Sequence, residues 1–254
     1  MARFSVGVQL HPQHCTIEDL RRGWRAADEL AVDTIWTWDH FFPLYGEPGG
    51  PHFEGWSLLT AMACETSKAR FGMLVTCNSY RNPQLLADMA RTVDHLSGGR
   101  LILGIGSGWF ERDYREYGYE FGTARGRLEA LGENLPLIKS RLAKLNPPPM
   151  GELPILIGGG GEKMTLRLVA EHANMWNGFG PPEVFRHKNE VLDRWCAEVG
   201  RDPASIERTV TLDEEEEIEQ LEEFLSAGAE HIIVGRGAPF DLTAVKKLLE
   251  SARG

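Results

Sequence analysis

Asp39 and His40, two consecutive residues at the end of an apolar segment, carry side chains that can move protons. A carboxylate and an imidazole can also hydrogen-bond a heteroaromatic ring near neutral pH. If Asp39 faces a ligand, strand alternation places Trp36 and Trp38 against the covering helices. The alternative is an aspartate that caps the next loop beside a surface histidine, and the dipeptide alone does not decide between them.

Glycines connect an apolar segment to a predicted helix later in the chain. These four residues are Gly158, Gly159, Gly160 and Gly161. Free N–H groups at the start of the helix that follows, near Lys163, favour a phosphate group. The alternative is a glycine turn needed only for tight packing of strand and helix. Residues 104–108 form a second glycine set, whose spacing is not that of a dinucleotide fingerprint, so the rim of a barrel is the better interpretation.

Small polar residues end a third apolar segment, where Thr76, Cys77 and Asn78 replace the apolar pattern. Their size allows a planar ligand to approach the backbone closely. The loop 41–56 is long and rich in aromatic residues, which predicts an apolar wall of a pocket. The alternative for this loop is simple packing over the edge of the sheet.

Apolar strands and amphipathic helices alternate along the chain that must position these residues. The predicted strands are Phe4–Leu10, Thr34–Trp38, Phe71–Cys77, Leu101–Gly106, Pro154–Ile157, Ala173–Asn177, Arg208–Leu212 and Glu230–Val234. The predicted helices are Ile17–Leu30, Trp56–Ser67, Pro83–Leu96, Arg125–Leu145, Lys163–Glu171, Pro182–Val199, Asp213–Ala227 and Leu242–Ala252. Eight strand–helix pairs predict a closed (β/α)8 TIM barrel, an α/β fold in a single domain over residues 1–254. An open doubly wound sheet is the alternative.

Composition restricts the classes of function. The net charge of −10 and the lack of a basic cluster argue against a nucleic-acid partner. Four cysteines without CxxC spacing indicate reduced thiols in a cytoplasmic protein, and no segment is apolar enough to span a membrane. The acidic residues 213–217 are explained by an Asp213 helix cap rather than by a metal site.

Several of these segments together resemble the bacterial luciferase-like family, and within it the F420-dependent oxidoreductases more than the FMN monooxygenases. The resemblance rests on Asp39-His40-Phe41, TCNSYRNP, LSGGRLILGIGSGW and PILIGGGGEKMTLRLVAEHANMWN. It covers roughly residues 4–180. The rest of the chain is short for the family and lacks the longer inserted loops that often close the substrate pocket.

The resemblance implies coenzyme F420 at the mouth of the barrel, a small organic substrate, a homodimer and hydride transfer at C5 of the deazaflavin. The cofactor contacts that it implies are Asp39, Thr76, Cys77, Asn78, Ser107, Gly108 and Gly158 to Gly161, with a non-proline cis bond at Cys77-Asn78. It also places His40 beside the reaction centre, as the first candidate for proton delivery.

One departure from the family concerns the catalytic glutamate of its sugar-phosphate dehydrogenases. Trp109 stands at the matching position, and Glu111 lies two residues further on as a possible substitute. An indole there indicates stacking or shaping of the pocket and disfavours sugar-phosphate oxidation. Reduction of an activated double bond and oxidation of an alcohol both stay open.

Three alternatives follow. An FMN-dependent monooxygenase uses the same barrel but requires reduced flavin and oxygen. A metal-dependent hydrolase could use His11, His14 and Asp39, but His11 and His14 lack HxH spacing, and we expect no metal. The short C-terminal part also allows a non-catalytic member that only binds the cofactor.

Overall fold

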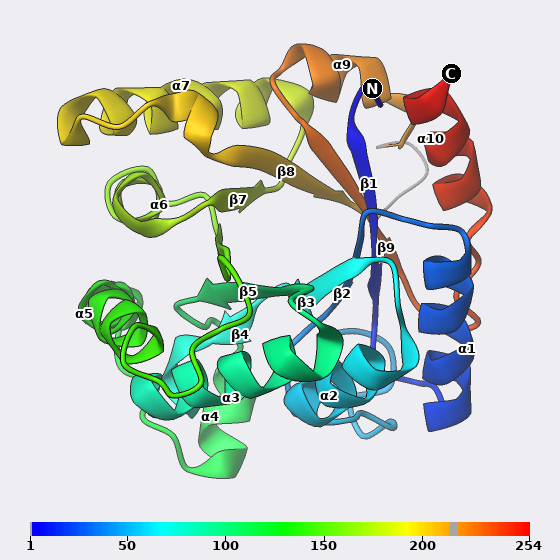
Figure 1. The fold of residues 1–254 in the computed structure, drawn as a ribbon, viewed down its shortest axis with the longest axis horizontal. Helices are drawn as coiled ribbons and strands as arrows, with labels where there is room; N and C mark the ends of the chain where they lie inside the picture. Colours follow the sequence, from blue (N-terminus) through cyan, green and yellow to red (C-terminus); the bar gives the residue numbers. More distant parts are fainter. Residues whose placement is uncertain (1, 214–217) are drawn as a thin grey trace.

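Parallel strands close into a barrel with helices around it in this computed structural model, which describes residues 2–213 and 218–254 (Figure 1). The strands are β1 (Ser5–Leu10), β2 (Thr34–Thr37), β3 (Arg70–Met73), β4 (Thr76–Cys77), β5 (Leu101–Gly106), β6 (Ile155–Gly158), β7 (Met175–Gly178), β8 (Glu207–Leu212) and β9 (His231–Arg236). The strand order is β3-β2-β1-β9-β8-β7-β6-β5-β4, and β3 also pairs with β5, which closes the ring. The predicted TIM barrel is confirmed.

The helices follow the predicted pattern with changes at their ends. They are α1 (Ile17–Glu29), α2 (Gly55–Glu65), α3 (Pro83–Ser97), α4 (Glu111–Tyr117), α5 (Ala124–Leu142), α6 (Thr165–His172), α7 (Pro182–Val199), α9 (Leu221–Ser226) and α10 (Thr243–Arg253), with short 3-10 turns η1 (Asn78–Tyr80) and η2 (Pro203–Ser205). Strand–helix alternation does not predict α4, because it is an excursion between β5 and α5. The predicted helix from Asp213 includes residues 214–217, which lie outside the described part of the chain.

Local signals explain where α3 begins and ends. The Asn82 side chain accepts hydrogen bonds from the N–H groups of Gln84 and Leu85, and Pro83 occupies the first turn. Gly98 ends the helix in the left-handed conformation with a φ of 71°, which glycine adopts without steric penalty.

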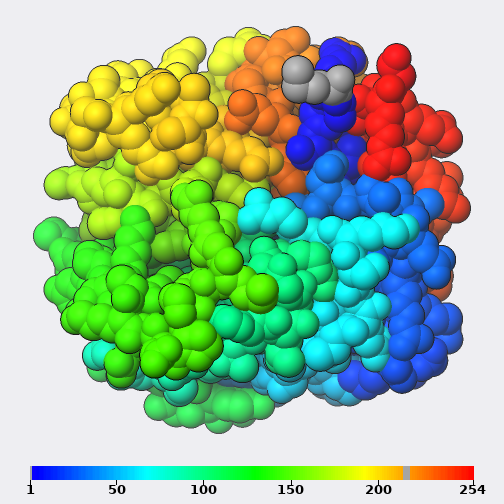
Figure 2. Space-filling model, viewed as in Figure 1, coloured from blue at the N-terminus to red at the C-terminus, as the bar shows by residue number. Residues whose placement is uncertain are grey.

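The two ends of the chain lie side by side in Figures 1 and 2, where the blue first strand borders the red last helix. The N–H of Arg3 donates to the carbonyl of Ala252, and β1 pairs with β9 along its length. No helix among residues 2–213 and 218–254 is long and apolar enough to cross a membrane.

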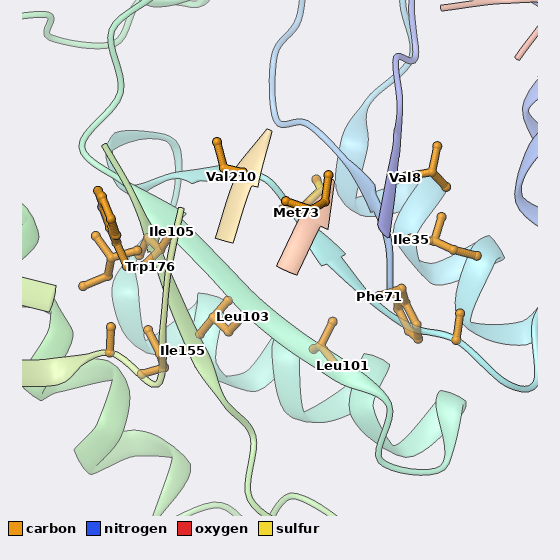
Figure 3. Close-up of a cluster of buried hydrophobic side chains, with 14 of the residues drawn as sticks. Val8, Ile35, Phe71, Met73, Leu101, Leu103, Ile105, Ile155, Trp176 and Val210 are labelled. Carbon is orange, nitrogen blue, oxygen red and sulfur yellow. The ribbon is translucent and has the colours of Figure 1, made fainter. Parts of the chain in front are cut away.

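The main hydrophobic core lies between the strands and the helices. Figure 3 shows part of it, in which Val8, Ile35 and Phe71 come from three neighbouring strands. A second cluster joins Trp36 to Ile102, Leu156, Met175 and Ile233, residues of five different strands, and therefore fills the inside of the barrel.

The predicted orientation of Trp36 and Trp38 is wrong. Trp36 lies in the cluster inside the barrel, while Ile35 belongs to the core on the helix side. The indole N–H of Trp36 donates to Oγ1 of Thr34 at 2.7 Å. Gly72 leaves space for the ring, because a Cβ there would lie 2.9 Å from it. Trp38 lies at the mouth of the barrel, where it lines a cavity.

The predicted third strand is interrupted by a bulge at Leu74 and Val75. Gly72 pairs with Ile102, but Thr76 pairs with Ile105, so this strand holds one more residue than its neighbour between the two pairs. A cis peptide joins Leu74 to Val75. The cis bond that the resemblance implied at Cys77-Asn78 therefore lies three residues earlier.

Glycines on the neighbouring strands make room for this bulge. A Cβ on Gly106 would lie 2.7 Å from the Val75 side chain, and one on Gly158 would lie 3.0 Å from it. A Cβ on Gly104 would lie 1.8 Å from the carbonyl oxygen of Met73. Close packing against the bulge thus accounts for part of both glycine-rich segments.

We expect Gly104→Ala to lower the free energy of unfolding by about 2–3 kcal/mol, because the new methyl group overlaps backbone that cannot move aside easily. Gly151→Ala is the matched control, since nothing lies within 4 Å of its Cβ position. Urea denaturation of both variants measures the difference. Equal stability of the two variants would contradict the close approach of the bulge.

Candidate functional site

A cleft lies at the carboxyl ends of the strands and consists of two adjoining cavities of about 350 and 550 Å³. Both are lined by Leu74, Val75, Gly108, Trp109, Asn177 and Phe179. The first is also lined by Gln9, Trp38, Asp39, His40, Leu44, Cys77, Tyr80, Thr211 and Asp213, and the second by Gly106, Ser107, Gly158 and Gly159. These volumes are in the range of small-molecule sites.

The bulge brings an apolar pair to the cleft in place of the predicted polar residues. Leu74 and Val75 line both cavities, and the Gln9 side chain fixes the bulge by donating to the carbonyl of Leu74 at 2.8 Å. Thr76, Cys77 and Asn78 form the elbow that follows the bulge, and of these three predicted contacts only Cys77 lines the cleft. Thr76 and Asn78 are buried behind it, and Asn78 accepts a hydrogen bond from Asn134.

Asp39 reaches the wall of the first cavity, but the chain itself occupies its carboxylate. Oδ1 accepts from Arg81 at 2.9 Å, and Oδ2 accepts from Arg81 and from the N–H of Cys77. The guanidinium also donates to Glu54 at 3.1 Å. A buried carboxylate needs such partners to stay charged. Asp39 therefore ties the end of β2 to the elbow.

His40 is held by a buried aspartate that sequence reasoning missed. Its Nδ1 lies 2.7 Å from Oδ2 of Asp113, whose side chain is fully buried. Asp113 also accepts from the hydroxyl of Tyr80 at 3.0 Å and from the N–H of Phe41 at 3.1 Å. An acceptor at Nδ1 places the proton of neutral His40 there and leaves Nε2 as the free proton acceptor.

The signal that could have pointed to Asp113 is weak. It is one of two acids in the first turn of α4, and no spacing rule links it to His40, 73 positions away in the sequence. The other acid, Glu111, is half-exposed and accepts from Arg115 at 2.6 Å. Because Glu111 is not among the described residues that line either cavity, the structure does not bring this predicted catalytic residue to the cleft.

Trp109 stands at the rim beside His40. Its side chain is 63% exposed, and the two rings meet edge to face with their centres 5.8 Å apart. The loop 41–56 contributes Leu44 to the cleft, whereas Phe41 stacks on Tyr117 of α4. The predicted aromatic wall from this loop is therefore wrong for Phe41, which packs against its neighbours instead.

Two more histidines are buried near the first cavity. Burial, with a smaller effect of Arg236, lowers the pKa of His11 to about 4, and its ring stacks on Trp38. His52 accepts from the indole of Trp38 at 3.0 Å, and burial lowers its pKa to about 4 as well. Both rings are neutral near pH 7. No group of three His, Cys, Asp or Glu side chains is placed to hold a metal ion among the described residues.

The glycine segment after β6 reaches the second cavity through Gly158 and Gly159. The N–H groups of Gly160 and Gly161 donate to no backbone carbonyl within the described chain. The helix α6 begins at Thr165, two residues after the predicted start. Opposite this segment Asn177 accepts from the hydroxyls of Thr209 and Thr211, which leaves its amide nitrogen for the cleft.

Residues 1–225 match the model of a family described as luciferase-like monooxygenases. An F420-dependent glucose-6-phosphate dehydrogenase of Amycolatopsis mediterranei is 32% identical over 53% of this chain and 40% of its own length. A 4-hydroxyprotoasukamycin monooxygenase of Streptomyces nodosus is 26% identical over 77% of this chain and 58% of its own length. The chain thus spans about half the length of these relatives.

The same fold occurs in a solved structure of an F420-dependent secondary alcohol dehydrogenase in complex with an F420-acetone adduct. The TM-score is 0.88 at 16% identity, and the alignment covers 99% of this chain and 100% of the other. At this identity the likeness concerns the fold alone.

The lowered pKa of His11 predicts a loss of stability in acid. The unfolded chain takes up a proton near the ordinary pKa, while the folded chain takes it up only at about pH 4. Stability therefore falls as the pH drops from 7 to 5, and His11 accounts for about 2 kcal/mol of this loss. We expect His11→Gln to reduce the pH 7 to pH 5 difference in unfolding free energy by that amount.

His95→Gln, at an exposed position of α3, is the matched control for this measurement. Urea unfolding at both pH values gives the comparison. An unreduced difference in His11→Gln would contradict a neutral, buried His11.

Proposed function

Because the chain belongs to the luciferase-like monooxygenase family, we propose that it is an oxidoreductase that binds coenzyme F420 in the cleft. The reaction is hydride transfer to or from a small organic substrate. One observation carries the proposal: the buried Asp113 holds His40 at the wall of an apolar cleft large enough for a flat ring and a substrate.

The residues present fit a deazaflavin. Leu74 and Val75 give an apolar surface for a ring, and Ser107 and Gly108 border the second cavity. Gly108 has a φ of 83°, and a Cβ there would lie 2.0 Å from the hydroxyl of Tyr114, so no larger residue fits at this edge. The free N–H groups of Gly160 and Gly161 suit a phosphate. When bound, the deazaflavin supplies the hydride donor or acceptor at C5.

The chain itself supplies orientation, exclusion of water and a proton site. His40 holds or releases the substrate proton at Nε2, because Nδ1 is committed to Asp113. The hydrogen bond to Asp113 fixes the direction of the ring. Asp39 with Arg81 keeps the elbow in place, and Leu44, Trp38 and Val75 keep the substrate side of the cleft apolar.

An FMN-dependent monooxygenase is the second candidate. It is favoured by the Streptomyces relative, whose name is that of a monooxygenase. The same cleft would then hold reduced FMN, and the reaction would consume oxygen.

A titration of the purified protein with F420, FMN and NADPH side by side tests the proposed function. We expect F420 to saturate the protein at a concentration at least about tenfold below FMN, with no binding of NADPH. Isothermal calorimetry measures all three. Tighter binding of FMN would replace the proposal by the monooxygenase, and no binding of either would reject both.

We expect His40→Gln and Asp113→Asn each to lower kcat by about 100-fold, because the proton site is removed in one variant and loses its fixed orientation in the other. The Kd for F420 should stay within about twofold, since neither variant removes the apolar surface or the glycine N–H groups. Thr60→Ser, on α2 and outside the cleft, is the control. Unchanged kcat in both variants would remove the pair from the mechanism.

A further inference from the structure

Two large aromatic side chains lie exposed at the rim of the cleft. Trp109 is 63% exposed and Phe179 is 61% exposed, and each lines both cavities. Trp109 follows β5 and Phe179 follows β7, the two strands that flank β6 in the barrel. Exposed aromatic groups at a concave site offer apolar contact to a ligand.

The indole of Trp109 is positioned by the proton site itself. Its ring contacts His40 edge to face, with the ring centres 5.8 Å apart. The ring centres of Trp109 and its chain neighbour Phe110 are 5.4 Å apart. The ring centres of His40 and Phe110 are 5.5 Å apart. A substrate whose reacting oxygen lies at Nε2 of His40 therefore has aromatic surface next to it.

The charges around the first cavity are unsuited to an anionic substrate. Neither arginine nor lysine is among the lining residues in the described ranges. Arg81, which lies behind the wall, is bound to Asp39 and Glu54. A phosphate or carboxylate there would lose its hydration and find no arginine or lysine among the described lining residues to pair with.

We propose that the substrate is a neutral molecule with an aromatic group, which packs against Trp109 and Phe179 while its alcohol or carbonyl oxygen meets His40. This inference rests on the proposed function for its reacting group. The recognition itself depends only on the rim and on the absence of arginine and lysine from the described lining residues.

Three probes that differ in one feature each test this inference. They are 1-phenylethanol, 2-propanol and 4-(1-hydroxyethyl)benzoate. Saturation-transfer NMR measures their binding to the protein loaded with F420 or FMN, whichever binds, or to the protein alone if neither does. We expect 1-phenylethanol to bind at least about tenfold more tightly than the other two.

Rim variants decide whether the aromatic residues cause this preference. Trp109→Ala and Phe179→Ala should each weaken binding of 1-phenylethanol by about tenfold, and Trp109→Phe should restore most of it. With turnover, the ratio of KM values for 2-propanol and 1-phenylethanol should narrow by a similar factor. Unchanged binding in both alanine variants, or tighter binding of the benzoate, would overturn the inference.

The outcome is separate from that of the cofactor titration. If F420 binds normally but 1-phenylethanol does not bind more tightly than the other two probes, only this inference is rejected. If 1-phenylethanol is still preferred by a protein that binds neither F420 nor FMN, only the proposed function is rejected.

Discussion

The insertion of Val75 into the mouth of the barrel determines the shape of the site. One extra residue in the strand formed by β3 and β4 turns Leu74 and Val75 toward the cleft. The side chain then needs space, and Gly106 and Gly158 on the neighbouring strands provide it. The same displacement moves Thr76 and Asn78 out of the cleft and into the wall. An apolar surface at the strand ends is the result.

Two buried carboxylates organise the polar side of this surface in different ways. Asp39 is neutralised by Arg81 and joins β2 to the elbow after β4. Asp113 pairs with no arginine or lysine of the described residues, and it contacts the imidazole of His40 and the hydroxyl of Tyr80. A buried acid whose side-chain partners are a histidine and a phenol holds that imidazole in one orientation. The first acid thus stabilises the wall, and the second orients the group that meets the substrate.

The sequence predicted the barrel and several helices because these follow from local rules. The alternation of strands and helices, and the cap at Asn82 with Pro83 and Gly98, depend on neighbouring residues only. Alternation along β2 separated two faces correctly but could not say which one was inside, so Trp36 was assigned to the wrong side. A tryptophan fits inside the barrel only where other strands carry small residues beside it, such as Gly72.

The site was predicted less well, because it depends on contacts between distant segments. The bulge changes the register without changing the apolar pattern, so the resemblance places the cis bond three residues too late. The pairing of His40 with Asp113 joins the loop after β2 to α4, a helix that lies outside the strand–helix alternation. The sequence linked Gly158 to a phosphate site, but a glycine is also needed there because a side chain would crowd Val75.

A crystal structure of the protein with F420 bound measures the central claim most directly. The account predicts that the deazaflavin ring contacts Leu74 and Val75, with its phosphate within hydrogen-bonding distance of the N–H of Gly160 or Gly161. A ring bound away from this pair, or a bulge that withdraws from the lumen, would contradict it.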